Sequence, residues 1–296
     1  MNSSTLKARS AQGANSLRIE PLSAATGAEC IEVDLKHLRD GEWERLFEAY
    51  HRSSLLVVRD QALPKSDQIA FSKRFGELEL PIRKDYVGKD YADLHVVTNV
   101  GPDAKPNNTK GLENPGNYFW HTDASYMRKP ASTTLLYAID IPEAGGDTNF
   151  ANMHAAYDGL SPSVKERIGG LRAVHSWEQS RYNSGSRLAS EEEKLLAPPV
   201  AHPLVRTHPV TGRKGLYLGN HTSHIEGMEI EPGRALLGEL LEHATQPQFV
   251  YRHKWRIGDI VIWDNRSLLH KASDDFDMNN CRRVLHRTVI QGTVPQ

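Results

Sequence analysis

Short apolar runs bounded by polar or glycine-containing turns recur along most of the chain and predict a protein built largely from strands. Leu55-Leu56-Val57-Val58 is a four-residue apolar run flanked by charge, as expected of a buried strand. One or two short strands are expected between Ser16 and Leu35. Further strands are predicted over residues 94–100, 132–139, 148–150, 204–208, 215–218, 249–255, 260–263 and 284–289.

Apolar residues at three- and four-residue spacing predict fewer helices. The clearest covers Asp40 to Arg52, with Asp40 as its cap, and a second covers Ser66 to Phe75, with Ser66 as N-cap and Gly76 as stop. Further helices are predicted over residues 153–160, 162–168 and 233–245.

This distribution indicates a mainly β, α+β fold in which two sheets form a sandwich or jelly roll, with helices flanking it. We find no internal repeat and no boundary that supports a second domain, so residues 17–296 are expected to form one domain. A polar, irregular stretch predicts an insertion around residues 77–117, and a second insertion is expected around residues 160–200, where the polar segment 180–199 is expected to be mobile. Residues 1–16 form a polar segment that we expect to be disordered.

Composition narrows the classes of function. The chain has 296 residues and a formal net charge of −1, so no overall field favours nucleic acid or membranes. Its two cysteines, Cys30 and Cys281, exclude a disulfide framework and a thiolate zinc site, and fit a reducing cytoplasm. There is no apolar segment of signal-peptide or membrane-spanning length. The number of subunits stays open.

Three residues suggest a metal site. His121 and Asp123 are two apart, so both project from one face if the chain is extended there. His270 follows the apolar strand 260–263 and a polar turn, which is expected to place it at a sheet rim. Two histidines and a carboxylate form the facial ligand set of non-haem Fe(II) oxygenases. Chance pairing, and histidines with only structural roles, remain alternatives at this stage.

Two arginines near the C-terminus extend this hypothesis. In a strand, Arg283, Leu285 and Arg287 lie on one face. If that face lines a cavity, the two guanidinium groups are receptors for carboxylates. If it faces solvent, they are ordinary surface charges.

Four motifs, in this order, give the sequence a family resemblance: WHTDASYM, GGDTNFANMHAAYDGLS, WDNRSLLH and RRVLHR. Together they resemble the Fe(II)/2-oxoglutarate dioxygenases of the taurine dioxygenase family, from about Glu20 to the C-terminus. Within that family, the stretch from HPLVRTHPVTGRK to WDNR is most similar to the 2,4-dichlorophenoxyacetate (aryloxyalkanoate) dioxygenases. The resemblance implies a double-stranded β-helix (jelly roll) core.

The resemblance also implies roles for individual residues. His121, Asp123 and His270 match the iron ligands, which are also the catalytic residues. Thr148 and Arg283 match the positions that hold the distal carboxylate of 2-oxoglutarate.

Substrate-binding residues are implied in the same way. Arg287 matches the arginine that meets the substrate's acidic group, and Asn117 matches a residue that lines the pocket. The loop containing Lys84, with Arg83 and Tyr86, corresponds to a segment that covers the substrate in relatives. The rings of Tyr86, Tyr118 and Phe119 would pack against an aromatic substrate, with packing in the protein core as the alternative. His175 and His208 are expected to be structural, although a place in the substrate pocket stays open for both.

The expected function is therefore the Fe(II)- and 2-oxoglutarate-dependent hydroxylation of a small acidic substrate, with dioxygen as second cosubstrate. An aryloxyalkanoate such as a (chloro)phenoxyacetate would be cleaved at its ether to a phenol and an oxo acid, with release of succinate and CO2. Such a reaction belongs to the degradation of aromatic compounds. Taurine or another sulfonate is the alternative substrate. A zinc hydrolase and a non-catalytic cupin-like binding module are alternatives of other classes.

Overall fold

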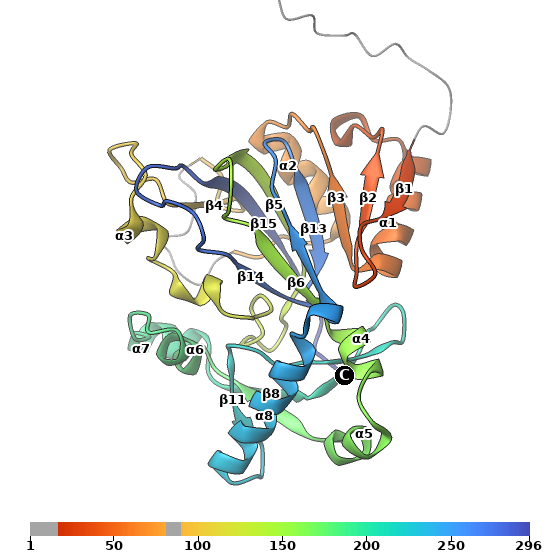
Figure 1. The fold of residues 1–296 in the computed structure, drawn as a ribbon, viewed down its shortest axis with the longest axis vertical. Coiled ribbons are helices and arrows are strands. Elements are labelled where there is room, and N and C mark those ends of the chain that lie inside the picture. Colours follow the sequence, from red (N-terminus) through yellow and green to blue (C-terminus); the bar gives the residue numbers. More distant parts are fainter. Residues whose placement is uncertain (1–16, 81–89) are drawn as a thin grey trace, which may run out of the picture.

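The computed structural model describes residues 17–80 and 90–296. The expectations for the N-terminal segment and for Arg83, Lys84 and Tyr86 therefore lie outside the described residues. Within the described residues the chain forms a mixed α+β structure, as predicted, but with more sheets than the two expected (Figure 1).

The largest sheet has seven strands in the order β1-β2-β3-β13-β5-β15-β4. Its neighbours are antiparallel except for β2 and β3, which run parallel. The strands are β1 (Arg18–Pro21), β2 (Ala28–Ile31), β3 (Leu55–Val58), β4 (His95–Thr98), β5 (Ala131–Asp140), β13 (Ile260–Asp264) and β15 (Val284–Gln291). Strand β13, predicted from its apolar run, lies between β3 and β5 at the middle of this sheet.

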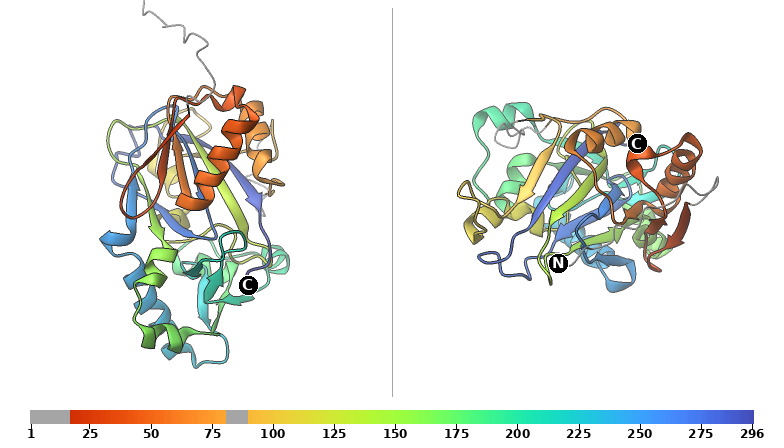
Figure 2. Two further views of the ribbon diagram at one scale, coloured as in Figure 1. Left: turned by 90° about the vertical axis from the view of Figure 1, so that its right-hand side faces the viewer. Right: turned by 90° about the horizontal axis from the view of Figure 1, so that it is seen from above.

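Both faces of the large sheet are covered, which explains why strand β3 is apolar throughout. Leu56 and Val58 of β3 belong to a core cluster that includes side chains of helix α1 (Asp40–Ser53) and helix α2 (Lys65–Ser72). The two helices lie side by side on one face of the sheet (Figures 1 and 2). Leu55 and Val57 point the other way, into a second cluster.

That second cluster joins the large sheet to a smaller one. The small sheet has the order β12-β6-β14, with β6 (Thr148–Asn152) between β12 (Val250–His253) and β14 (Leu268–Ala272). Phe150 of β6 and Leu268 of β14 pack in one cluster with Trp263 and Leu285 of the large sheet. The two sheets therefore enclose a shared core, as in a sandwich.

The lower half of the molecule in Figure 1 contains the other sheets and several helices. A three-stranded sheet, β11-β7-β8, and a hairpin, β9-β10, lie there, together with helix α8 (Ile230–Ala244), which packs on β11. The other strands are β7 (Arg172–His175), β8 (Val200–Pro203), β9 (Val205–Thr207), β10 (Lys214–Leu216) and β11 (Thr222–Ile225). The other helices are α3 (Asn108–Gly111), α4 (Met153–Asp158), α5 (Pro162–Ile168), α6 (Trp177–Asn183) and α7 (Glu191–Leu196), and the 3-10 turns are η1 (Leu35–His37), η2 (Lys73–Phe75), η4 (Pro115–Tyr118) and η5 (Pro247–Phe249).

Two predicted helix caps are wrong. Arg39, not Asp40, occupies the N-cap of α1, because the Glu42 carboxylate accepts hydrogen bonds from the Arg39 backbone N–H and its guanidinium. Pro64 precedes α2, and Ser66 lies inside the helix with its hydroxyl bonded to Asp67. In both helices the chain enters one or two residues earlier than the sequence pattern indicated.

Two further expectations need correction. The polar segment 180–199 is not irregular throughout, since it completes α6 and contains α7, whose N-cap Ser190 forms a capping box with Glu193. His270 was expected beyond a strand, at a sheet rim, but it lies within strand β14, where it pairs with Phe150 of β6. The polar turn before it carries the chain from the large sheet to the small one.

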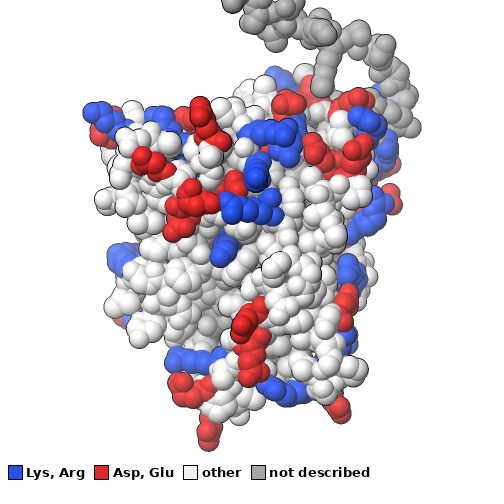
Figure 3. All heavy atoms as spheres, viewed as in Figure 1, with Lys and Arg blue, Asp and Glu red and all other residues white. Residues whose placement is uncertain are grey.

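Charged side chains of both signs are interspersed over the face shown in Figure 3, in keeping with the net charge near zero. No helix among the described residues is both long enough and apolar enough to cross a bilayer.

Candidate active site

The three candidate metal ligands meet at one point between the sheets. One nitrogen each of His121 and His270 and one oxygen of Asp123 all lie within 4.8 Å of one another. Asp123 Oδ1 is 3.7 Å from Nε2 of each histidine. Two ligand atoms bound to one metal at about 2.0–2.2 Å are separated by at most roughly 4.4 Å, so these spacings suit a shared ion.

Backbone pairing brings the distant histidines together. His121 and His270 form an isolated antiparallel bridge, with His121 N–H donating to His270 O at 3.1 Å and His270 N–H donating to His121 O at 2.8 Å. His121 lies in this bridge rather than in a long strand, and the chain turns immediately after it, with Ala124 at φ 52°. The turn returns the Asp123 carboxylate towards both imidazoles.

Asn265, in the turn between β13 and β14, holds the loop that carries Asp123. Its side-chain oxygen accepts the Asp123 backbone N–H at 3.1 Å, and its amide donates to Thr134 Oγ1 at 2.9 Å. Thr134 in turn donates to Asp123 Oδ2 at 2.7 Å. This leaves Asp123 Oδ1 directed at the histidines. Bonds of this kind orient ligands and are worth about 10- to 100-fold in metal affinity.

The protonation states suit a divalent cation. His121 Nδ1 lies 2.8 Å from the Phe119 carbonyl, which fixes the proton on that nitrogen and leaves Nε2 as the ligand atom. Burial lowers the pKa of both His121 and His270, so both imidazoles are neutral at pH 7. Burial alone would raise the pKa of Asp123, but Arg287 and the two histidines outweigh it and hold that pKa well below its usual range. Neutral imidazoles and an ionised carboxylate are the forms that bind metal.

Two cavities adjoin this cluster. They share six lining residues, namely His95, Asn114, Asn117, His121, Asp123 and Arg287. The arginine cavity, named for Arg283, is also lined by Tyr118, Thr148 and His270. The tryptophan cavity, named for Trp177, is also lined by Glu79, Tyr126, Arg181 and His221. The metal cluster therefore lies between two separate binding spaces.

The arginine cavity contains a buried cation. Arg283 is only 8% exposed, and burial lowers its pKa to about 10. Its Nε donates to the Gly146 carbonyl at 2.8 Å, and Gly146 has a φ of 67°, where only glycine is readily accommodated. No carboxylate of the described residues pairs with Arg283, because nearby Asp147 is bonded to Arg252 at 2.6 Å. A buried cation of this kind calls for an anionic ligand.

The tryptophan cavity combines aromatic and charged groups. The rings of Tyr126 and Trp177 lie 4.8 Å apart, and the buried guanidinium of Arg181 lies over Trp177 at 5.2 Å. Burial, followed by the charge of Asp123, raises the pKa of Glu79 to about 7. The cavity therefore offers aromatic ring faces beside a buried cation.

The residues predicted from sequence fall into both cavities. Asn117 and Arg287 line both, whereas Tyr118 lines only the arginine cavity, beside Thr148 and Arg283. Arg287 also contacts Asp123 Oδ1 through its NH2 at 2.6 Å. Phe119, expected to pack against a substrate, is 43% exposed and lines neither cavity.

Sequence reasoning did not select Tyr126, Trp177 or Glu79. Tyr126 lies in the motif WHTDASYM, three residues after Asp123, and this proximity was the available signal. Trp177 lies at the start of α6, two residues after His175 but far in sequence from the metal-ligand motifs, so only the folded arrangement places it here.

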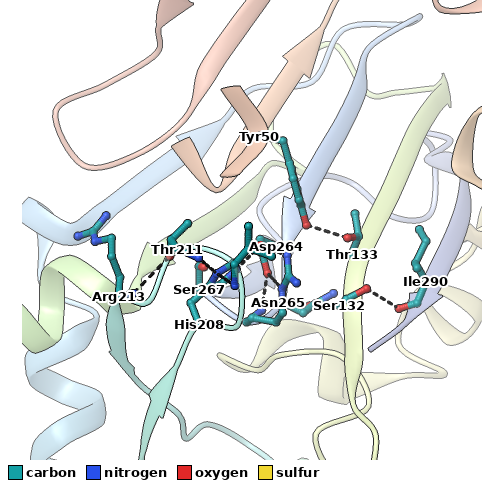
Figure 4. A network of polar contacts seen from close by, with 12 residues as sticks. Tyr50, Ser132, Thr133, His208, Thr211, Arg213, Asp264, Asn265, Ser267 and Ile290 are labelled. Carbon is teal, nitrogen blue, oxygen red and sulfur yellow. Dashed lines mark hydrogen bonds and ion pairs between the residues drawn. The ribbon is translucent and has the colours of Figure 1, made fainter. Parts of the chain in front are cut away.

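In a second group of possible ligands, His51, His208 and Asp264, one nitrogen or oxygen atom of each residue also lies within 4.8 Å of the others. His208 Nδ1 accepts the backbone N–H groups of Val210 and Thr211, so its Nε2 carries the proton and donates to Asp264 at 3.0 Å (Figure 4). Arg266 donates to both oxygens of Asp264, at 2.7 and 2.8 Å. The guanidinium already supplies the positive charge, so we interpret this cluster as a structural ion pair.

His175 also lies outside both cavities. It is fully buried, and its Nδ1 is 3.0 Å from the Ser125 hydroxyl, which is itself 3.0 Å from Nδ1 of His221. The structure thus places neither His175 nor His208 against the space where a substrate would lie.

Comparisons with known proteins agree with this geometry. Residues 18–289 match the family described as "Taurine catabolism dioxygenase TauD, TfdA family". The chain is 40% identical over 283 residues to an alpha-ketoglutarate-dependent 2,4-dichlorophenoxyacetate dioxygenase of Cupriavidus pinatubonensis, covering 93% of this chain and 97% of that protein. A second protein of the same description, from a Burkholderia species, is 43% identical over 247 residues and covers 81% and 82%.

Solved structures share the fold over nearly the whole chain. A crystal structure of AAD-2 in complex with Mn(II) and N-oxalylglycine has a TM-score of 0.84 and 38% identity, covering 94% of this chain and 99% of that one. A structure of a taurine dioxygenase from Burkholderia xenovorans has a TM-score of 0.79 and 31% identity, covering 95% and 91%.

Proposed function

Because the chain belongs to the taurine catabolism dioxygenase TauD, TfdA family, whose members use Fe(II) and 2-oxoglutarate, we propose that this 2-oxoglutarate-dependent dioxygenase hydroxylates an aryloxyalkanoate such as a (chloro)phenoxyacetate. Hydroxylation at the carbon beside the ether oxygen gives a hemiacetal, which collapses to a phenol and an oxo acid. Succinate and CO2 are the products of the cosubstrate. Membership of this family excludes the two alternative functions, a zinc hydrolase and a non-catalytic cupin-like binding module.

We further infer that the two facing sheets form a double-stranded β-helix. The likeness to AAD-2 over almost the whole chain supports this topology, as does the position of the metal cluster between β14 and the chain segment that pairs with it.

The assignment of metal ligands rests on the donor set described above. His121, Asp123 and His270 would hold the ferrous ion, which together with dioxygen and 2-oxoglutarate supplies the oxidising power for attack on a C–H bond. Asn265 and Thr134 keep the carboxylate oriented, and the Phe119 carbonyl fixes the tautomer of His121.

Arg283 is the single observation that carries the cosubstrate assignment. It is a buried guanidinium in a cavity that also reaches the metal cluster, and 2-oxoglutarate has one end that chelates a metal and a second, distal carboxylate. A guanidinium binds a carboxylate through two parallel hydrogen bonds. Thr148 lines the same cavity and offers a hydroxyl to that carboxylate.

The tryptophan cavity is then the space for the substrate. Tyr126 and Trp177 offer ring faces, and Arg181 and Arg287 make its surroundings positive. A guanidinium has five N–H donors, so the contact of Arg287 with Asp123 leaves others for a substrate carboxylate. The raised pKa of Glu79 reduces its negative charge at neutral pH, which weakens its repulsion of an acid.

A sulfonate such as taurine is the second candidate, because it is also a small acid and a taurine dioxygenase shares the fold. The paired rings of Tyr126 and Trp177 favour the aryl substrate, since taurine offers no aromatic surface to bury.

A substrate screen tests this proposal. The Fe(II)-loaded protein is assayed for succinate with phenoxyacetates, both enantiomers of phenoxypropionates, and sulfonates, and for release of a phenol. We expect succinate and phenol in equal amounts with at least one aryloxyalkanoate. Faster turnover of taurine would overturn the substrate assignment, and no succinate with any acid would overturn the proposed function.

Two variants test whether the tryptophan cavity binds the substrate. Trp177→Leu should raise KM for the aryl substrate by about tenfold through lost ring contact, without changing KM for 2-oxoglutarate. Phe119→Leu, at an exposed ring that lines neither cavity, is the matched control and should behave as the parent. Equal effects of the two variants would argue against the tryptophan cavity as the substrate site.

A further inference from the structure

The hydroxyl of Thr148 accepts a hydrogen bond from the indole of Trp255. Thr148 lies in β6 at the centre of the small sheet, paired with His253 of β12 and Ala272 of β14, and is 3% exposed. Trp255 follows β12, and its Nε1 lies 3.0 Å from Thr148 Oγ1. Thr148, but not Trp255, lines the arginine cavity.

The direction of this hydrogen bond is certain, because an indole N–H is only a donor. A threonine hydroxyl has one proton and two acceptor lone pairs, and the indole occupies one of the lone pairs. The Thr148 proton has no hydrogen-bond acceptor among the described residues. A buried donor without an acceptor is costly, so this proton needs a partner from the cavity.

We propose that Trp255 is a positioning residue that fixes the Thr148 hydroxyl as a donor to the distal carboxylate of 2-oxoglutarate. Without the indole, the hydroxyl proton is free to rotate among other directions, and the carboxylate loses a preorganised donor beside Arg283. This inference deepens the proposed function and rests on it.

Trp255 is itself rigidly placed. It is 7% exposed and belongs to the core cluster between the sheets. Its ring meets that of His253 edge to face, with centroids 4.6 Å apart at 86°. His253 Nε2 is 3.1 Å from Asp259 Oδ2, and Arg59 donates to the same oxygen at 2.6 Å. This chain of contacts holds the indole in one orientation.

The test measures ligand binding without turnover. The Mn(II)-loaded protein is titrated in a calorimeter with N-oxalylglycine, which has both carboxylates of 2-oxoglutarate, and separately with oxalate, which has only a chelating end. Trp255→Phe should raise the Kd for N-oxalylglycine by about five- to tenfold, the scale of one neutral hydrogen bond, and leave the Kd for oxalate unchanged. Trp43→Phe, in the cluster on the other face of the large sheet, controls for the loss of an indole.

A double-variant cycle isolates the pair. Thr148→Val should also weaken N-oxalylglycine, by about tenfold or more, and Trp255→Phe should then add nothing further. Thr148→Ser, which keeps the hydroxyl, should bind within about twofold of the parent, and it keeps the proposal testable if a tryptophan variant folds poorly. Unchanged binding by Trp255→Phe, an equal loss for oxalate, additive effects, or a Thr148→Ser affinity as low as that of Thr148→Val would each overturn the inference. Failure of the parent to bind N-oxalylglycine at all would instead overturn the proposed function.

Discussion

Replacing Arg283 by methionine should make the ligand-free protein more stable while impairing cosubstrate binding. Burial lowers the pKa of Arg283 from its ordinary 12.5 to about 10, which corresponds to a cost of about 3 kcal/mol at 1.36 kcal/mol per pH unit. A base whose pKa is lower in the folded state binds fewer protons when folded, so this cost is complete at neutral pH and is relieved only above about pH 10. Methionine has a similar length and removes the cost.

The lost hydrogen bond to the Gly146 carbonyl offsets about 1 kcal/mol of this gain. We therefore expect the free energy of unfolding of the metal-free protein to increase by about 1–2 kcal/mol at pH 7.5, measured by urea denaturation. In the Mn(II)-loaded protein, loss of a buried charge partner should cost about 2–4 kcal/mol of N-oxalylglycine binding, or roughly 30- to 1,000-fold in Kd. Such opposite effects mark a residue kept for function at the expense of stability.

A decrease in stability together with unchanged N-oxalylglycine affinity would refute this reasoning, because it would make Arg283 a structural residue. Arg282→Met provides the matched control. Arg282 is adjacent in sequence but largely exposed, and it pairs with Asp140 at 2.7 Å. It should change stability by less than about 1 kcal/mol and leave ligand binding unaltered.

Three further predictions concern the metal cluster and its surroundings. His121→Ala should weaken Mn(II) binding by more than about 100-fold, since even groups that only orient a ligand are worth 10- to 100-fold; an unchanged Kd by calorimetry would remove it from the site. Arg287→Leu should destabilise the metal-free protein by about 2–4 kcal/mol because it leaves the buried Asp123 without its closest positive partner. Added Mn(II) should recover most of this loss, and an unchanged midpoint of urea denaturation would contradict the pairing of Arg287 with Asp123. Glu79 has a raised pKa, so the folded protein binds more protons than the unfolded one between pH 4.5 and about 7 and loses stability as pH rises through that window. Glu79→Gln should reduce this loss of stability by about 1–3 kcal/mol between pH 5 and 8, and parallel curves of stability against pH for parent and variant would contradict the prediction.

The parts of the fold that the sequence predicts best are those with an unambiguous local pattern. The run Leu55–Val58 is apolar at every position because both faces of the large sheet are covered, and it forms β3 as expected. Helix caps were predicted less well, since Asp40 and Ser66 are good capping residues on average, yet Glu42 and Pro64 decide where the two helices begin. Which of two nearby residues caps a helix depends on the conformation of the chain just before the helix, and residue preferences alone do not give that conformation.

The candidate site also has residues that the sequence predicts and residues that it does not. His121, Asp123 and His270 could be predicted because a metal requires particular ligand types. The backbone bridge between the two histidines explains where the three side chains meet. The wall of the tryptophan cavity could not be predicted. Trp177 contributes to it from a helix within a segment that was expected to be an insertion, and no local sequence pattern indicates a contact between segments so distant along the chain.

The most direct test of the central claim is a crystal structure of the protein with Mn(II) and N-oxalylglycine. We expect one metal ion bound to His121, Asp123 and His270 with no further protein ligand, and the far carboxylate of the analogue against Arg283 and Thr148. An ion at His51, His208 and Asp264, a fourth protein ligand, or an analogue whose far carboxylate lies away from Arg283 would contradict the account.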